Sequence, residues 1–416
     1  MNFDKFLKAL VASIIAFTGV ISTKANNNIL DTIVYRNPAG NEFPILAGCA
    51  FEAPNLVTSE NFRIIRQAGF NLMESWFAND STIQEAIDAA RGSGVRILLS
   101  TPGVEDYWSI PPTVRKYKDC SEIMGYVLTD EPSAKSVKEL RRRRDAVLAE
   151  SPEQYPFITL LPIYASEKQL GVTSYRKYLE AFADTVQLPI LCYDNYPIIL
   201  KGGFLTLRDD YFENLEIAHD VATQHNVPLW TYIMSSSHLN YPEPTEGHMM
   251  FEAFTSLAYG AQGLLYYTYG DPRIPQDISY NDTPIDREGN KTPTWYKARK
   301  INNCIQRLAT IFLGADIDII RHTGANIPTG TIPLRFSDLP LQFRSITSQG
   351  AGIVVSVFSN NDHKYLLIVN KDFSNSQNIS ISKSTEVNRV YPDGSVRKDR
   401  ANKVKLTPGG FCLYTW

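Results

Sequence analysis

The sequence predicts an α/β protein, a (β/α)8 TIM barrel followed by a C-terminal antiparallel β-sandwich. Between residues 43 and 270, eight short apolar runs alternate with longer amphipathic stretches. Parallel strands that are covered on both faces are near-continuous apolar runs of this kind, and eight of them close into a barrel. From about residue 335 the chain changes to short strand-like runs separated by polar turns, which is typical of an antiparallel sandwich.

The barrel elements follow in order along the chain. We expect strands at residues 43–50, 70–77, 95–100, 123–128, 157–163, 189–193, 227–234 and 263–269. We expect helices at residues 59–68, 81–93, 134–150, 173–185, 211–224, 245–259 and 293–313. The third helical segment, 108–118, contains Pro111 and Pro112, so a short or irregular helix is predicted there. The arginines at 141–144 lie within an expected helix and are interpreted as a solvated face.

The N-terminus has the pattern of an export signal. Lys5 and Lys8 precede an apolar run at residues 9–21, and a Thr-Lys-Ala sequence ending at residue 25 offers a cleavage site. The expected location is periplasmic or extracellular, with no membrane anchor after cleavage, and the alternative is a buried N-terminal helix. The expected parts are a signal peptide, a catalytic barrel, and a sandwich that packs on it without contributing catalytic groups, at residues 1–25, 26–325 and 326–416.

Composition narrows the function classes. The formal net charge is −3 and the basic residues are otherwise dispersed, so no nucleic-acid-binding surface is expected. The five cysteines stand singly without a CxxC pair, which argues against a thiolate metal site, and we expect neither a metal nor a cofactor. The 22 Tyr, 20 Phe and 5 Trp include many near strand ends, where rings could stack on sugars. The sequence carries no indication of oligomeric state.

Polar and aromatic residues at the carboxyl ends of the strands are the site candidates, because the active sites of such barrels lie there. In glycoside hydrolysis one carboxyl group protonates the leaving oxygen while a second attacks or activates water, and flat rings bind the sugar. A ring of carboxylates and aromatics with few cations fits this chemistry. The candidates are Glu52, Glu74, Trp76, Asp130, Glu131, Asp194, Tyr196, Trp230, Tyr232, Tyr267 and Tyr269.

The most specific motif is Gly-Tyr-Val-Leu-Thr-Asp-Glu-Pro at residues 125–132. It resembles the fourth-strand ending of the large clan of retaining glycoside hydrolase barrels, where Asn-Glu-Pro carries the general acid/base. The resemblance implies that Glu131 is the proton donor, with Asp130 in place of the Asn. Residues 257–269 and 406–411 are similar to the eighth strand and the last turn of the β-domain in hypothetical glycosidases of gut Bacteroidetes. The resemblance covers most of residues 40–416 and implies a glycoside hydrolase acting on an oligo- or polysaccharide.

The sequence departs from this clan at the seventh strand, where the clan has its nucleophilic Glu. Residues 229–235 read Leu-Trp-Thr-Tyr-Ile-Met-Ser and contain no carboxylate. We predict Asp194 as the second carboxylate, because it ends the sixth apolar run and Pro197 holds the following residues extended. Strands four and six are two apart, so we expect the carboxyls to be too far apart for direct attack, which favours inversion. Glu74 and Glu246 are the alternatives.

Other interpretations remain open on sequence alone. Asp130 and Glu131 could belong to a helix N-terminus and satisfy its dipole, and Asp194 could hold an Asx turn. The missing seventh-strand acid favours a second function class, a non-catalytic carbohydrate-binding barrel. A third class, a barrel lyase or other non-hydrolytic enzyme, requires a Lys, Tyr or His base near a carboxylate. A fold does not decide among these classes.

Overall fold

The structure is a computed structural model, and it describes residues 35–51, 53–272 and 278–416. These residues belong to one compact unit. The expected signal peptide and Glu52 lie outside the described residues. Within these ranges, no helix is long and apolar enough to cross a bilayer.

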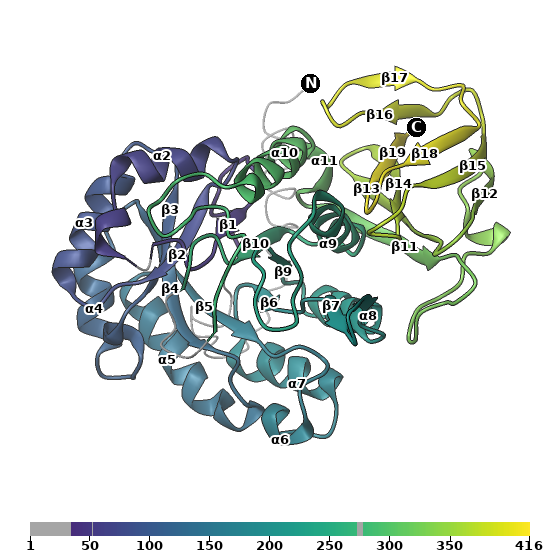
Figure 1. Cartoon of the computed structure of the whole chain (residues 1–416). Helices are drawn as coiled ribbons and strands as arrows, with labels where there is room; N and C mark the ends of the chain where they lie inside the picture. Colours follow the sequence, from purple (N-terminus) through teal and green to yellow (C-terminus); the bar gives the residue numbers. More distant parts are fainter. Residues whose placement is uncertain (1–34, 52, 273–277) are drawn as a thin grey trace, which may run out of the picture. The chain divides into compact units, whose positions relative to one another are not determined.

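Eight parallel strands form a closed barrel, so the predicted barrel is confirmed (Figure 1). Each of the eight predicted apolar runs contains or overlaps one strand. Around the barrel the order is β1-β10-β9-β6-β5-β4-β3-β2. The strands are β1 (Ile45–Ala47), β2 (Leu72–Trp76), β3 (Arg96–Ser100), β4 (Ile123–Asp130), β5 (Tyr155–Leu160), β6 (Leu191–Tyr193), β9 (Leu229–Met234) and β10 (Gly263–Tyr267).

Helices surround the barrel on its outer side (Figure 1). They are α2 (Ser59–Gln67), α3 (Asp80–Ala90), α4 (Ile110–Tyr117), α5 (Val137–Glu150), α6 (Glu167–Leu170), α7 (Tyr175–Ala181), α8 (Tyr211–Gln224), α9 (Glu246–Ala258), α10 (Pro293–Arg307) and α11 (Ala309–Phe312). The third helix, α4, is short but regular. Pro111 and Pro112 lie in its first turn, where the N–H groups have no partner within the helix in any case.

The arginine run of α5 is not the solvated face that we expected. Arg143 is 9% exposed and Arg144 is 1% exposed. Arg143 lies three residues after Leu140 and four before Val147, and this spacing puts all three on the helix face that packs on the barrel. The charge of this run therefore does not indicate which of its arginines are exposed to solvent.

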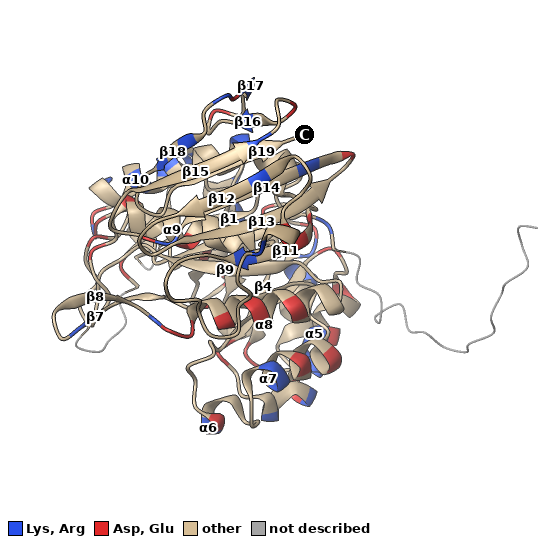
Figure 2. Ribbon diagram, turned by 90° about the vertical axis from the view of Figure 1, so that its right-hand side faces the viewer, with Lys and Arg blue, Asp and Glu red and all other residues tan. Residues whose placement is uncertain are grey.

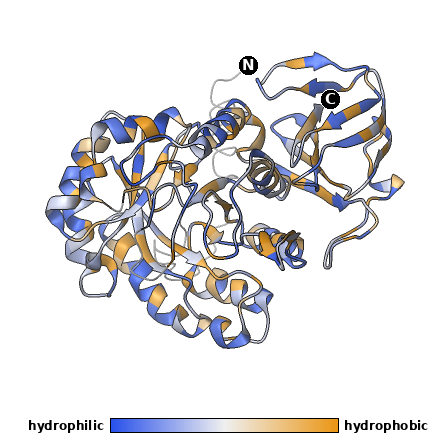
Figure 3. Cartoon of the chain, viewed as in Figure 1, coloured by the Kyte–Doolittle hydropathy of each residue, from blue (hydrophilic) through white to orange (hydrophobic). Residues whose placement is uncertain are grey.

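Two apolar layers hold the barrel together. The inner layer fills the barrel with side chains from the strands, including Leu46, Leu98, Met124, Phe157 and Trp230. The outer layer lies between strands and helices and continues into the C-terminal domain. Figure 3 shows the same division, with apolar residues along the strands and polar residues frequent on the outer sides of the helices.

The C-terminal domain is a sandwich of two antiparallel sheets, as predicted. The larger sheet has the order β11-β13-β14-β19-β16-β17 and the smaller one β12-β15-β18, with an apolar cluster between them. The larger sheet begins at Asp316, ten residues before the boundary that we placed at 326. The strands are β11 (Asp316–His322), β12 (Phe343–Ser348), β13 (Ile353–Asn360), β14 (His363–Asn370), β15 (Gln377–Lys383), β16 (Asn388–Val390), β17 (Val396–Lys398), β18 (Lys403–Leu406) and β19 (Phe411–Thr415).

The sandwich packs on the barrel through α9 and α11. The rings of Phe254 in α9 and Phe411 in β19 are stacked, with centroids 3.9 Å apart. The Asn360 side chain donates to the carbonyls of Ile311 at 3.0 Å and Leu313 at 2.7 Å, which are free at the end of α11. The domains therefore share one apolar core rather than being joined only by a linker.

One buried carboxyl links a barrel helix to a strand end. Glu252 of α9 is 2% exposed, and its Oε2 accepts the N–H of Met234, the last residue of β9, at 2.7 Å. Burial raises the pKa of Glu252 from 4.5 to about 8. The group is therefore protonated in the folded protein at neutral pH, whereas in the unfolded chain it ionises near its ordinary value.

We predict that Glu252 makes stability fall as the pH rises from about 4.5 to 8. Over this window the unfolded chain loses a proton that the folded chain keeps, at a cost of about 5 kcal/mol. Glu252→Gln keeps an oxygen for the Met234 N–H and should remove this fall, which urea unfolding at pH 5 and pH 8 would measure. Glu246→Gln, at a half-buried position of the same helix where the carboxylate pairs with Lys300, is the control. An equal pH dependence in wild type and Glu252→Gln would contradict the prediction.

Candidate active site

The carboxyl ends of the barrel strands bring most of the predicted site residues together. Glu74 and Trp76 lie on β2, Asp130 ends β4, Asp194 follows β6, Tyr232 lies on β9, and Tyr267 ends β10. Parallel strands of a closed barrel present these ends on one side. We refer to this side as the barrel mouth.

The two acids at the end of β4 are fixed by β5. The Glu131 N–H donates to the carbonyl of Thr159 at 2.9 Å. The φ of Glu131 is 45°, a left-handed conformation that is uncommon for a residue with a side chain and often found at functional sites. The Asp130 carboxyl is hydrogen-bonded to the Thr159 hydroxyl. The backbone and a side chain of β5 thus both hold the end of β4.

The carboxyl groups of Glu131 and Asp194 are hydrogen-bonded to each other. Two carboxyl groups can form such a bond only when one of them carries a proton. Asp194 lies deeper, and its Oδ1 is buried with no hydrogen-bond partner within the described part of the chain. This buried acceptor beside a shared proton is a candidate partner for a polar ligand.

The three acids of the mouth perturb one another. Burial raises the pKa of Asp194 well above its ordinary value, and the charges of Glu131 and Asp130 raise it further. Burial also raises the pKa of Glu131, the direction we expected for a proton donor, and lifts that of Asp130 to about 6, with help from the Glu131 charge. Asp130 and Glu131 are open to solvent but surrounded by protein, so water stabilises their charges poorly. The hydrogen bond acts to lower the pKa of Glu131 and to raise that of Asp194, so the shared proton is held mainly by Asp194.

A wall of tyrosines stands beside these acids. The ring of Tyr196 lies 6.2 Å from that of Tyr232, 5.7 Å from that of Tyr241 and 5.5 Å from that of Tyr267, measured between centroids. The Tyr232 hydroxyl is 3.0 Å from the Thr159 hydroxyl, which connects the wall to Asp130. Ligand sites are commonly apolar and aromatic surfaces with a few fixed polar groups, and this tyrosine wall (196, 232, 241 and 267) with its acids has that composition.

Glu74 and Trp76 occupy the β2 side of the mouth. Glu74 is half-buried, and its Oε2 accepts the N–H of Cys49 at 3.1 Å. Leu72 belongs to the inner layer of the barrel, so Glu74, two residues further along β2, also faces inward, as Tyr232 of the tyrosine wall does. Trp76 is 47% exposed at the rim.

Two of the predicted substrate-binding residues belong to the core instead. Trp230 is 0% exposed and lies in the inner layer of the barrel, two residues before Tyr232 on the same face of β9. Tyr269 is also 0% exposed, and its ring packs edge-on against that of Phe70 at 5.3 Å. Neither can contact a substrate. Sequence alone did not distinguish them, because an aromatic residue near a strand end fits the core and the mouth equally well.

The expected wide separation of Glu131 and Asp194 is also wrong. Because neighbouring strands are about 4.8 Å apart, we expected acids that are separated by two strands to leave room for a water molecule between them. The structure brings their carboxyls into hydrogen-bonding contact, because side chains that point into a closed barrel converge. The argument for inversion therefore no longer holds.

Sequence reasoning missed Thr159 and Tyr241. Thr159 is 5% exposed and lies in an apolar run of β5. The only indication of its role in the sequence is that it carries a hydroxyl where the strand could have an aliphatic residue. Tyr241 lies in the loop after β9, beyond the strand ends that we considered. The helix-dipole interpretation of Asp130 and Glu131 has no support, since Ser133 caps the helical turn that follows.

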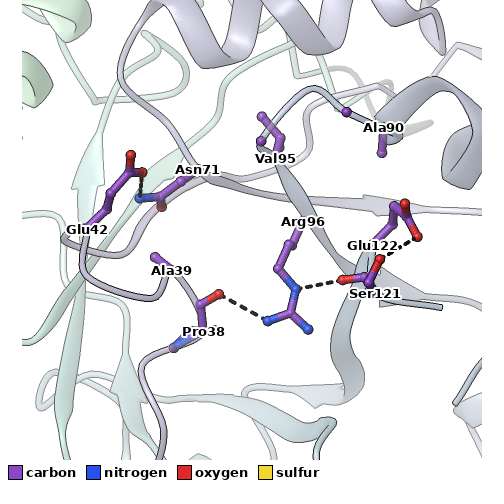
Figure 4. Close-up of a pocket in the computed structure, with 11 residues that line it drawn as sticks. Pro38, Ala39, Glu42, Asn71, Ala90, Val95, Arg96, Ser121 and Glu122 are labelled. Atoms are coloured by element: carbon purple, nitrogen blue, oxygen red, sulfur yellow. Dashed lines mark hydrogen bonds between the residues drawn. The ribbon is translucent and has the colours of Figure 1, made fainter. Parts of the chain in front are cut away.

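A hollow of about 280 Å³ lies at the opposite, amino-terminal end of the strands (Figure 4). The guanidinium of Arg96 donates there to the carbonyls of Ser121 at 2.9 Å, Pro38 at 3.0 Å and Ile123 at 3.1 Å. These bonds tie the segment before β1 to the bottom of the barrel, so we interpret the hollow as structural. Across the described ranges, no three His, Cys, Asp or Glu side chains are arranged to hold a metal ion.

Comparison with solved structures finds glycoside hydrolases with the same barrel. The chain matches Gan42B, a GH42 β-galactosidase from G. stearothermophilus, with a TM-score of 0.63 and 8% identity over 91% of this chain and 98% of that one. It matches the β-galactosidase of Bacillus circulans sp. alkalophilus with a TM-score of 0.59 and 8% identity, covering 90% and 99%. It matches that of Halorubrum lacusprofundi with a TM-score of 0.50 and 12% identity, covering 68% of this chain. The chain spans 59% of the length of this last enzyme and 60% of that of the Marinomonas ef1 β-galactosidase. No protein-family model and no curated protein sequence matches the chain.

We predict that Asp130 titrates near pH 6 and that removing the neighbouring charge lowers its pKa. Glu131→Gln deletes a negative charge that disfavours ionisation of Asp130, so the Asp130 midpoint should fall. Carbon-13 NMR of labelled aspartate carboxyls across pH 3–9 measures this without any substrate. Glu74→Gln, also at the mouth, should leave the midpoint unchanged. A wild-type midpoint near 4 that does not respond to Glu131→Gln would contradict the arrangement described above.

Proposed function

We propose that this protein is a glycoside hydrolase that cleaves O-glycosidic bonds of an oligo- or polysaccharide by carboxylic acid/base catalysis. Glu131 is the proton donor and Asp194 is the second carboxylate. The observation that carries the proposal is the hydrogen bond between these two carboxyls at the mouth of the barrel. Glycoside hydrolysis needs one protonated and one ionised carboxyl beside the anomeric carbon, and a pair that shares one proton supplies both forms.

The surroundings of the pair support this chemistry. Burial raises the pKa of both carboxyls, which favours a proton on the pair, and the tyrosine wall offers flat rings beside it. Substrate must part the two carboxyls. We propose that the proton then passes to Glu131, which is open to the solvent side where a leaving group departs, and that Asp194 is left ionised.

The role of Asp194 follows from its closeness to Glu131. Retaining enzymes have their carboxyls about 5–5.5 Å apart and inverting ones about 6.5–9.5 Å, because the inverting base needs room for water. Two carboxyl groups in hydrogen-bonding contact fit the shorter distance. Asp194 therefore attacks the anomeric carbon, and the bond to the leaving oxygen breaks as that oxygen takes the proton of Glu131. Water then hydrolyses the glycosyl ester, with Glu131 as the base.

Substitution of the two carboxyls tests this assignment. Glu131→Gln should lose at least about 100-fold in kcat on natural glycosides, which need protonation, and much less on activated aryl glycosides. Asp194→Asn should lose activity on both, and azide should restore it with formation of a glycosyl azide. Para-nitrophenyl glycosides, the β-galactoside first, are the probes. Glu246, one of the alternatives for the second carboxylate, pairs with Lys300 of α10 at 2.6 Å, so Glu246→Gln is a control away from the pair. Full activity of Glu131→Gln on an oligosaccharide would remove this residue from the mechanism.

Exposed rings on several loops of the mouth support an extended substrate. They are Trp76 at the end of β2, Trp108 after β3, Tyr164 after β5 and Phe204 after β6, with exposed fractions of 47%, 79%, 39% and 78%. Phe204 lies on the hairpin formed by β7 (Ile198–Lys201) and β8 (Phe204–Leu207), which projects from the body of the protein (Figure 2). Large apolar side chains exposed around one opening indicate a binding surface wider than one sugar.

Trp76→Ala should therefore raise KM for an oligosaccharide about tenfold, the loss of roughly one stacking contact. The same change should leave KM for a para-nitrophenyl monosaccharide within about twofold, since that probe does not reach the rim. Tyr296→Ala removes a similarly exposed ring, 57% exposed, from α10 and should change neither value. Equal effects of Trp76→Ala on both probes would place this ring next to the reacting sugar instead.

One observation favours a second function, a carbohydrate-binding barrel without catalysis. β9 ends at Met234 and is followed by buried Ser235 and Ser236, so no carboxylate closes it. Calorimetric binding of an oligosaccharide with no product after long incubation would support this alternative. The basic and apolar leader of the sequence supports export to the periplasm or the cell exterior under either function.

A further inference from the structure

β4 is irregular where it approaches the acids. Val127 pairs with Phe157 of β5, but the next pair is Thr129 with Ile158, so Leu128 is an extra residue in β4. Such a β-bulge changes the direction of the side chains that follow it and is frequent beside active sites. Asp130 and Glu131 lie just after the bulge, so the bulge changes the direction of their side chains.

The bulge turns Asp130 toward the inside of the barrel. Val127 belongs to the inner layer, so regular alternation would place Thr129, and not Asp130, on the inner face. On β5, Phe157 also belongs to the inner layer, which puts Thr159 on the inner face. Asp130 pairs with Thr159 and is hydrogen-bonded to its hydroxyl, so Asp130 faces inward as well. The extra residue shifts the alternation by one position.

A buried arginine holds the bulged residue. Nη2 of Arg143 in α5 donates to the carbonyl of Leu128 and, at 2.6 Å, to the carbonyl of Val104 in the loop after β3. Arg143 is 9% exposed, and it lies on the core-facing side of α5 between Leu140 and Val147. A charged group in such a position is costly unless it is hydrogen-bonded, and an aliphatic side chain would fill the same space more cheaply.

We propose that Arg143 is a positioning residue for the acids of the mouth, holding the β4 bulge so that Asp130 and Glu131 face the reacting sugar. Its role in the reaction rests on the proposed function, whereas its effect on the direction of the acids does not. Arg143 does not reach the reacting atoms. It acts through the Leu128 carbonyl, two residues before Asp130. The charged groups near it are Glu139 on its own helix and Glu105 and Asp106 in the loop after β3.

The test compares Arg143→Met, Arg143→Lys and Arg142→Met. Arg143→Met removes the donors. Arg143→Lys keeps the charge on a side chain that is one bond shorter. It serves as a second variant in case Arg143→Met does not fold. Arg142→Met is the matched control, because Arg142 is exposed, pairs with Glu139 at 3.2 Å and stacks on Tyr107. Each variant is assayed with para-nitrophenyl glycosides for kcat and KM, and the Asp130 carboxyl is titrated by carbon-13 NMR.

Both Arg143 variants should lower kcat about 10- to 100-fold with little change in KM, since displacing an acid by about 1 Å costs this much. The Asp130 midpoint should fall toward that of a free aspartate, more in Arg143→Met than in Arg143→Lys, while Arg142→Met keeps both values. Folded Arg143 variants with unchanged kcat and midpoint would overturn the proposal. If wild type hydrolyses no glycoside, the proposed function fails, but a displaced Asp130 midpoint in the Arg143 variants still supports the positioning role and an unchanged one refutes it.

Discussion

The hydrogen bond between the carboxyls of Glu131 and Asp194 sets the conditions that the rest of the mouth must meet. It requires a proton, and the proton is retained only where water stabilises carboxylates poorly. The tyrosine wall and the depth of Asp194 provide such surroundings, and Asp130 adds a second negative charge beside that of the pair. The bond also requires β4 and β6, which are two strands apart, to direct side chains to one point. Closure of the barrel brings these side chains together. Fold and electrostatics are therefore coupled at this contact.

β4 departs from regular strand geometry at several positions next to the acids. At Gly125, a Cβ atom would lie 2.2 Å from the carbonyl oxygen of Tyr155, so only glycine lets β5 approach. The bulge at Leu128 reverses the alternation, and Arg143 accommodates the displaced carbonyl. Glu131 then adopts a left-handed backbone conformation. These irregularities lie within seven residues, next to the acids, which is where strain is expected if it serves a site.

Polar and aromatic residues inside the protein have structural roles that resemble functional ones. Glu252 holds the end of β9 in its protonated form, and Trp230 fills the barrel below Tyr232. His322, 0% exposed in β11, is 2.8 Å from the Tyr259 hydroxyl, where the sandwich meets the barrel. Each of these side chains is of a type that can take part in catalysis or ligand binding, but each is enclosed by protein, so a substrate does not reach it. Position relative to the mouth, and not residue type, separates them from the site.

The sequence by itself determined the barrel, the sandwich and most strand positions, because continuous apolar runs, helical periodicity and turn residues are local properties. It also marked Asp130, Glu131 and Asp194, since acids that end apolar runs are conspicuous. Only the tertiary structure decided that Glu131 and Asp194 touch, that Trp230 and Tyr269 are core, and that Arg143 is buried. These outcomes depend on strand register, on a bulge and on barrel closure, which bring together residues far apart in the chain. A local pattern does not encode distances between strands, and so it could not give the geometry of the site.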